Sequence, residues 1–333
     1  MRGVFRRERG SCLLFLTRKL TTSNKTRQRH REEAKPSIGD FYEIEDEVLG
    51  SGYFAIVMLG KDKRTGEKVA IKVITKSKVE NPQFQNEINI MSKVSHPNVV
   101  GLRAVFDTSA KLFIVMELVQ GGELYELISK RKRFSEEETS YIMCQVFSAL
   151  KYIHNIGIVH RDLKLENMLL VDKDGLDIKL ADFGLSKLYA GQALKTACGT
   201  PFYVAPDILQ GSGYGPAVDM WSCGVITYVL LSGRLPFHAN NDAELFQLII
   251  QGNLVFKSPQ FDTVSEKAKD LIRRLLVVNP ERRYTAEQAL QHPFVRDMGG
   301  SKFGLRRDEP ISDVLKPGSE LLVEGRSKND GYK

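Results

Sequence analysis

Three side chains that carry oxygen ligands occur at a spacing that could hold a metal ion beside phosphates. They are Asp162, Asn167 five residues later, and Asp182 fifteen residues beyond that. Carboxylate and amide oxygens, together with the oxygens of a substrate's phosphates, are ligands that suit Mg²⁺ in proteins. Each residue alone is typical of an ordinary turn, but the three together in this order indicate metal-assisted chemistry on a phosphate.

A glycine-rich segment, residues 49–57, could bring backbone N–H groups close to such a phosphate. Gly50 and Gly52 have no Cβ to keep a ligand away from the backbone. The segment is not a dinucleotide-binding fingerprint, because the pattern after it is that of a strand and not of a helix. It also lacks the Gly-Lys-Ser/Thr end of a Walker A loop.

Lys72 follows Gly50 by 22 residues, inside the apolar pattern Val69-Ala70-Ile71. Two interpretations are open. Lys72 is either a charge on an edge strand that keeps the sheet from aggregating, or a cation directed at phosphates and held by a carboxylate. Glu87, on the helix expected next, would supply that carboxylate, because an unpaired buried charge is costly.

In this order and spacing, the motifs resemble the catalytic domain of a eukaryotic protein kinase across residues 41–295. Lys164, two residues after Asp162, resembles the serine/threonine class. Residues 121–124, 196–201 and 291–294 resemble the calcium/calmodulin-dependent kinase group. The other matching positions are residues 50–57, Lys72, Glu87, residues 160–167, 182–184, 205–207 and 219–224, and Arg283.

The resemblance implies transfer of the γ-phosphoryl group of ATP, with Mg²⁺, to Ser and Thr hydroxyls of protein substrates. Asp162 would orient the hydroxyl and accept its proton, and Lys164 would lie beside the transferred group. Lys72, held by Glu87, would pair with the α- and β-phosphates, while Asn167 and Asp182 would bind the metal ion. The residues implied in ATP binding are Leu49, Gly50, Ser51, Gly52, Tyr53, Phe54, Ala55, Val57, Ala70, Lys72, Met116, Glu117, Leu118, Glu123 and Leu169.

Two other classes of protein fit the sequence less well than an active protein kinase. A pseudokinase scaffold would need a missing catalytic residue, and Lys72, Glu87, Asp162, Asn167 and Asp182 are all present. A small-molecule phosphotransferase is disfavoured because residues 199–207 resemble a platform for protein substrates.

Three positions depart from the family pattern. Ala55 replaces the third glycine of the loop, and Leu165 stands where proline is usual. Asp207 replaces the Glu that normally pairs with the arginine matched by Arg283. Because this carboxylate is one methylene shorter, we predict a strained or water-bridged pair.

The element pattern predicts an α+β, bilobal fold of the protein-kinase type. Strand patterns cover residues 42–45, 55–59, 68–73, 99–106 and 111–117, with one long helix beginning near Asn81. These form a small antiparallel lobe of about residues 41–118. A larger, mainly helical lobe of about residues 119–295 follows, with helices predicted after Ser135 and across 219–231 and 265–278. The catalytic domain as a whole is assigned to residues 36–295, and residues 296–333 to a polar tail.

Charge divides the 333-residue chain unevenly. Residues 1–35 hold eleven Lys and Arg against three Glu, a net charge of +8, which leaves −1 of the total +7 for the remainder. We expect a basic, disordered extension that is dispensable for catalysis; a mitochondrial presequence or an anion-binding arm is the alternative. The expected location is the cytoplasm, with the nucleus and the mitochondrion as alternatives.

Four cysteines without a CxxC pair argue against a disulfide framework, and no apolar stretch approaches the length of a membrane span. Neither a transmembrane segment nor a nucleic-acid partner is expected. Glu123 and Glu166 match positions that contact arginine upstream of the acceptor in related kinases, so the expected substrates carry upstream basic residues.

Regulation is expected in the segment after Asp182. Phosphorylation of Thr196 by an upstream activating kinase would add negative charge able to pair with Arg161, whereas Thr200 is assigned a structural and catalytic role. Calmodulin is not expected to bind this chain, because the residues after Phe294 lack a basic amphipathic helix with large apolar anchors.

Overall fold

A computed structural model describes residues 37–51, 55–76, 92–182, 187–188, 201–211 and 215–298. The Gly52–Phe54 tip of the glycine-rich segment, Glu87, and the activation-segment threonines Thr196 and Thr200 lie outside the described residues, as does the helix predicted near Asn81. No helix in the part of the chain that the structure describes is both long and apolar enough to cross a membrane.

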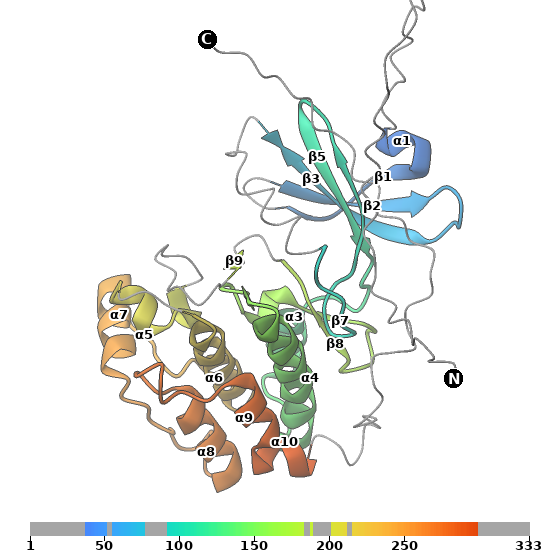
Figure 1. Ribbon diagram of the computed structural model, residues 1–333. Helices are drawn as coiled ribbons and strands as arrows, with labels where there is room; N and C mark the ends of the chain where they lie inside the picture. The colour runs from blue at the N-terminus through green and yellow to red at the C-terminus, as the bar shows by residue number, and fades with distance from the viewer. Residues whose placement is uncertain are drawn as a thin grey trace, which may run out of the picture. The chain divides into compact units, whose positions relative to one another are not determined.

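Five strands form an antiparallel sheet in the order β1-β2-β3-β5-β4 (Figure 1). They are β1 (Tyr42–Ser51), β2 (Ala55–Asp62), β3 (Lys68–Thr75), β4 (Leu102–Asp107) and β5 (Lys111–Glu117). Because successive side chains point to opposite faces, Val69 and Ile71 pack with Ile38 of the short helix α1 (Ile38–Phe41). Ile74, on the other face, joins the larger core that continues into the helices.

β3 pairs with β2 on one side and β5 on the other, which makes it an inner strand. Lys72 lies on this strand, opposite Val57 of β2 and Ile114 of β5. The interpretation of Lys72 as a solubility device on an edge strand is therefore wrong.

The helices follow the sheet along the chain and group together in Figure 1. They are α3 (Leu124–Arg131), α4 (Glu136–Asn155), α5 (Pro206–Leu209), α6 (Ala217–Ser232), α7 (Asp242–Gln251), α8 (Glu266–Leu275), α9 (Ala286–Gln291) and α10 (Pro293–Met298). Short pieces between α4 and α5 are the strands β6 (Ile158–Val159), β7 (Met168–Leu170), β8 (Ile178–Leu180) and β9 (Lys187–Leu188), and the 3-10 helices Leu165–Asn167 and Pro201–Tyr203. The predicted α+β architecture of a sheet lobe and a helical lobe is confirmed.

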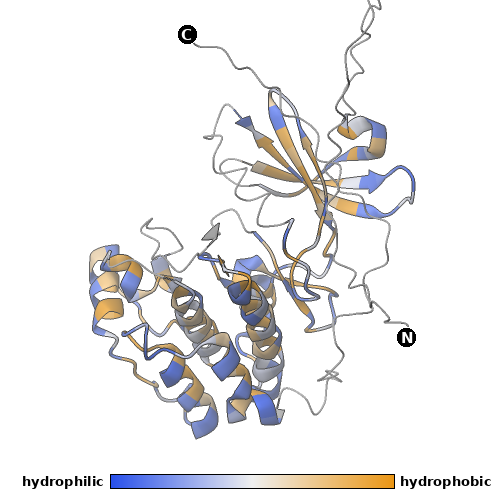
Figure 2. Cartoon of the chain, viewed as in Figure 1, coloured by the Kyte–Doolittle hydropathy of each residue, from blue (hydrophilic) through white to orange (hydrophobic). Residues whose placement is uncertain are grey.

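Helix α4 begins where its capping box was predicted. The Ser135 hydroxyl accepts from the Glu138 backbone at 3.1 Å, and the Glu138 carboxylate accepts from the Ser135 backbone at 3.0 Å. Helix α6 is buried from Val218 to Ser232, as its almost wholly apolar sequence predicts. In Figure 2 the hydrophobic colours dominate strands β3 and β5, while both colours appear along α4 and α8.

Two predicted boundaries are wrong. Helix α8 ends at Leu275, three residues before the predicted end at Val278, because Leu276 leaves the helical conformation at ψ 48°. Strand β4 begins at Leu102 and not near Val99, because Val99 pairs instead with Leu180 in an isolated parallel bridge.

Candidate active site

The loop that carries Asp162 is anchored from below by one buried carboxylate. Asp219 of α6 accepts the backbone N–H of His160 at 2.9 Å and that of Arg161 at 2.8 Å, and it lies 2.8 Å from His154 Nε2 of α4. Burial raises the pKa of Asp219, but the hydrogen bond and charge of His154, with the other donors, outweigh burial and lower the pKa overall. An ionised acceptor therefore fixes the loop where Arg161 adopts a left-handed φ of 75°.

Asp162 meets two of the predicted site residues directly. Its carboxylate Oδ2 lies 3.0 Å from Lys164 Nζ. Asn167 Nδ2 donates both to Oδ2, at 3.2 Å, and to the Asp162 carbonyl, at 2.7 Å. The 3-10 turn Leu165–Asn167 brings the Asn167 side chain back to Asp162. Asp162, Lys164 and Asn167 therefore form one cluster, although Leu165 stands where the family usually has proline.

Asp182 is brought to Lys72 from a distant part of the chain. Lys72 Nζ lies 3.2 Å from Asp182 Oδ1, and the two side chains are 16% and 50% exposed. Asp182 follows β8 with a left-handed φ of 62°, and the Ala181 backbone before it donates to the Asn167 carbonyl at 2.9 Å. This bond ties the strand that ends at Asp182 to the cluster around Asp162.

The residues expected around the adenine lie on the sheet and on β7. Ala70 of β3 is paired with Met116 of β5, and Val57 of β2 is paired with Gly50. Leu49 is 42% exposed near the end of β1. Ser51 and Ala55 flank the tip of the glycine-rich segment. Leu118 directly follows β5, and Leu169 lies on β7.

Gly121 and Gly122 bring the start of α3 against β7. Gly121 donates to the Leu170 carbonyl at 2.9 Å, and Leu170 donates to the Gly122 carbonyl at 2.8 Å. A Cβ on Gly121 would meet the Leu170 oxygen at 2.3 Å, so this approach requires glycine. The crossing places Glu123, which precedes α3, opposite Leu169.

Glu123 lies in an acidic cluster that also includes Glu126 and Glu166. Burial raises the pKa of Glu123, and the charges of Glu126 and Glu166 raise it further against the lowering effect of Lys164. Among the described residues, the buried Oε2 of Glu166 accepts no hydrogen bond. Burial raises the pKa of Tyr203, and the charge of Glu166 raises it further. The arrangement can bind a cationic side chain, which would supply the missing donor.

The prediction of a strained or water-bridged pair between Asp207 and Arg283 is wrong. Arg283 Nη2 binds Asp207 Oδ1 at 2.6 Å, Nη1 lies 3.4 Å from Oδ2, and the two side chains are 0% and 3% exposed. The guanidinium also donates to the carbonyls of Val277, Ala217 and Val278 and lies over the Trp221 ring. Helix α5 places Asp207 close enough to Arg283 for the shorter carboxylate side chain to bind the guanidinium directly.

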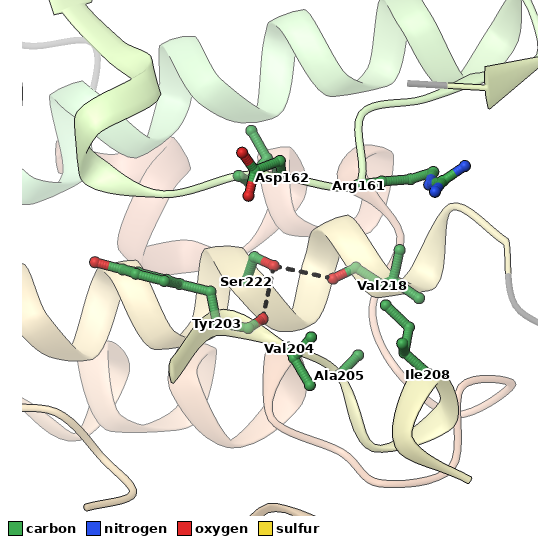
Figure 3. A pocket seen from close by; sticks show the side chains of 9 residues that line it. Arg161, Asp162, Tyr203, Val204, Ala205, Ile208, Val218 and Ser222 are labelled. Atoms are coloured by element: carbon green, nitrogen blue, oxygen red, sulfur yellow. Dashed lines mark hydrogen bonds between the residues drawn. The ribbon is translucent and has the colours of Figure 1, made fainter. Parts of the chain in front are cut away.

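Sequence reasoning did not assign site roles to Asp219, His154, Glu126 or Tyr203. Asp219 was visible only as part of a matched motif, and His154 lies 65 positions before it. Figure 3 shows Asp162 and Arg161 on one side of a small cavity, with Tyr203, Val204, Ala205 and Ile208 on the other. The Ser222 hydroxyl of α6 donates to the carbonyls of Tyr203 and Val218 and holds this segment beneath the loop.

The donors present fit a magnesium ion that is shared with phosphates. Asn167 binds Asp162 through Nδ2 and not through its amide oxygen Oδ1, and the Asp182 carboxylate is half exposed. No group of three or more His, Cys, Asp or Glu side chains within the described residues could hold a metal alone. Mg²⁺ commonly takes one or two carboxylates and completes its shell with phosphate and water oxygens.

Comparison with known proteins defines the class that this fold and cluster represent. The family model described as "Protein kinase domain" matches residues 42–295, and the chain belongs to this family. Protein kinases as a family use ATP and Mg²⁺ and act on protein substrates.

Similarity to individual kinases indicates which group of protein kinases the chain belongs to. The chain is 45% identical over 274 residues to calcium/calmodulin-dependent protein kinase type 1B of Mus musculus, covering 79% of this chain and 80% of the relative. It is 46% identical over 261 residues to myosin light chain kinase A of Dictyostelium discoideum, covering 77% and 88%. A probable myosin light chain kinase of the same organism is 44% identical over 283 residues, covering 83% and 72%. The chain is a serine/threonine protein kinase of the calcium/calmodulin-dependent kinase group.

Proposed function

We propose that the Asp162–Lys164–Asn167 cluster is the phosphotransfer centre, with ATP as donor and a Ser or Thr hydroxyl of a protein as acceptor. The observation that carries the proposal is the pair of hydrogen bonds that Asn167 donates to Asp162, which hold the carboxylate beside the Lys164 ammonium in a position to accept a proton. The acceptor oxygen forms a bond to the γ-phosphorus while the bond from that phosphorus to the β–γ bridging oxygen breaks. The hydroxyl proton goes to Asp162, and ADP leaves.

Lys72 would bind the α- and β-phosphates, with its position set by the inner strand β3 and by Asp182. Asn167 Oδ1 and Asp182 would hold Mg²⁺, which when bound neutralises charge on the phosphates. Lys164 would balance the charge of the transferred group. Glu117 already uses its N–H on the Gly101 carbonyl, at 3.0 Å, so its own carbonyl and the backbone of Leu118 would bind the adenine edge.

A degenerate peptide library with Ser, Thr or Tyr as the fixed acceptor tests this function. With Mg²⁺ and γ-labelled ATP, the full chain should label Ser and Thr peptides and leave Tyr peptides at background. Lys72→Met is the control that removes the phosphate-binding cation. Labelling no greater than that of Lys72→Met would contradict catalysis and favour the scaffold alternative.

The acidic cluster supports a preference for basic residues upstream of the acceptor. A guanidinium entering between Glu123 and Glu166 would form charge-assisted, two-pronged bonds and would satisfy the buried Glu166 oxygen. In the same library, Arg two or three residues before the acceptor should be enriched. Glu123→Gln and Glu166→Gln should each reduce that enrichment, while the exposed control Glu281→Gln should not. A flat profile at those positions would contradict the preference.

Calmodulin dependence does not follow from similarity to kinases whose names include it. Beyond Phe294 the aromatic residues of the printed sequence are Phe303 and Tyr332, and Pro310 and Pro317 would interrupt a helix there. We expect the chain to stay unbound in a pull-down with immobilised calmodulin and calcium. Retention that is lost on chelation of calcium would contradict this.

A further inference from the structure

One ion pair joins the end of β5 to the middle of β8. Glu117 Oε1 lies 2.8 Å from Lys179 Nζ, and the two side chains are only 24% and 19% exposed. The same oxygen accepts the Gly101 backbone N–H at 2.7 Å, while the Glu117 N–H donates back to the Gly101 carbonyl. The Glu117 carboxylate is therefore fixed by two donors in a place that solvent and salt screen weakly.

The two partners lie at the base end of the proposed nucleotide site, on two different strands. Glu117 is the last residue of β5, at the adenine edge, whereas Lys179 lies three residues before Asp182. Lys179 is also paired across the β7–β8 ladder with Leu169, the residue expected beneath the adenine. A contact between these two side chains therefore connects the strand at the adenine edge with the strand that leads to Asp182, at the metal and phosphate end.

The backbone makes a parallel but indirect connection. The Val100 N–H donates to the Leu180 carbonyl and the Leu180 N–H donates to the Asn98 carbonyl, both at 2.9 Å. The segment that includes Asn98 and Val100 thus pairs with β8, and Gly101 beyond it pairs with Glu117. The Lys179 side chain, by contrast, connects β8 to Glu117 directly.

We propose that Lys179 is a positioning residue that fixes the adenine edge relative to the strand ending at Asp182. This inference rests on the proposed nucleotide site. A ligand held at both ends, by its base and by its phosphates, depends on the distance between the two ends. A ligand held only by its base does not depend on this distance. Loss of the pair should therefore weaken the binding of nucleotides more than the binding of nucleosides.

The test compares the affinity of adenosine with that of ADP plus Mg²⁺ for the full chain and for Lys179→Met. We expect MgADP binding to weaken about tenfold and adenosine binding to stay within about twofold, with Lys179→Arg restoring the parent values. The matched control is Arg103→Met, which breaks an exposed pair with Glu67 on the same sheet, at 2.8 Å and with side chains 47% and 54% exposed. That control should change neither affinity.

An equal loss for both ligands would overturn the proposal, because the pair would then support the base pocket alone. Unchanged MgADP binding in Lys179→Met would also overturn it. Failure of the parent chain to bind MgADP would instead contradict the proposed function itself.

A second variant separates positioning from general damage to the fold. Glu117→Gln keeps an oxygen that can accept the Gly101 N–H but removes the charge that Lys179 pairs with. In this background Lys179→Met should cause little additional loss of MgADP affinity, since the pair is already broken. Additive losses in the double variant would contradict a function exerted through Glu117.

Discussion

Asn167 donates twice from a single amide nitrogen to Asp162, once to the carbonyl at 2.7 Å and once to the carboxylate at 3.2 Å. The proposed base is thereby tied to the turn that follows it, and neither bond uses the amide oxygen of Asn167. In the proposed mechanism, one side chain would therefore serve two needs of the reaction: orientation of a proton acceptor and provision of a metal ligand.

The two needs can be separated by two substitutions of Asn167. Asn167→Asp keeps an oxygen for Mg²⁺ but removes the donor to Asp162, whereas Asn167→Ala removes both. We expect kcat to fall by about 10² or more in each, the range for loss of a well-placed acid–base group. The Mg²⁺ concentration for half-maximal rate should rise only in Asn167→Ala. An unchanged Mg²⁺ requirement in Asn167→Ala would contradict the assignment of its oxygen to the metal.

The buried pair between Arg283 and Asp207 is expected to dominate the stability of the helical lobe around α5. Arg283→Leu would remove the guanidinium that pairs with the buried Asp207 carboxylate, and breaking such a buried pair typically costs about 3–5 kcal/mol. Arg273→Leu breaks a pair with Glu266 whose side chains are 48% and 75% exposed, so it should cost far less. Urea unfolding of both variants measures the difference, and equal losses would contradict it.

His96 should make stability depend on pH. Burial, with a further contribution from the Lys179 charge, lowers its pKa from 6.5 to about 4. Its ring accepts the Asn98 N–H at 3.1 Å and lies on Tyr152 at 5.3 Å between centroids, so the folded state favours the neutral ring. Between pH 6.5 and pH 4 the unfolded chain binds more protons at this position, and the stability that the neutral ring contributes is lost as pH falls through that window.

The control for this pH effect is His96→Gln, which cannot titrate. The free energy of unfolding of the parent minus that of His96→Gln should be constant above pH 7 and should decrease toward pH 4. Urea unfolding at four pH values measures this difference. A difference that stays constant over the whole range would show that His96 titrates alike in both states.

Local patterns predicted the elements that depend on local chemistry. The Ser135 capping box and the buried α6 follow from spacing and composition, and the family motifs identified Asp162, Asn167 and Asp182. The structure brings Asp162 and Asn167 into direct contact and Asp182 to Lys72. Spacing alone left Lys72 ambiguous, because only the strand order shows that β3 is an inner strand.

Features that depend on distant partners escaped sequence reasoning. The carboxylate of Asp219 receives donors from residues 58, 59 and 65 positions away. Val99 has strand character, but its bridge to Leu180 removes it from β4. The length of the Asp207 side chain predicts a strained pair, but the placement of α5 decides whether this side chain reaches Arg283.

The central claim is that Asp162 accepts the acceptor's proton, and turnover of Asp162→Asn tests it most directly. The control is Asp174→Asn, at an exposed position in the loop before β8. With Mg²⁺, ATP and a basic Ser peptide, Asp162→Asn should lower kcat by about 10²–10⁴ while MgADP affinity stays within a few-fold of the parent. Asp174→Asn should match the parent in both. Turnover by Asp162→Asn within a few-fold of the parent would contradict the account.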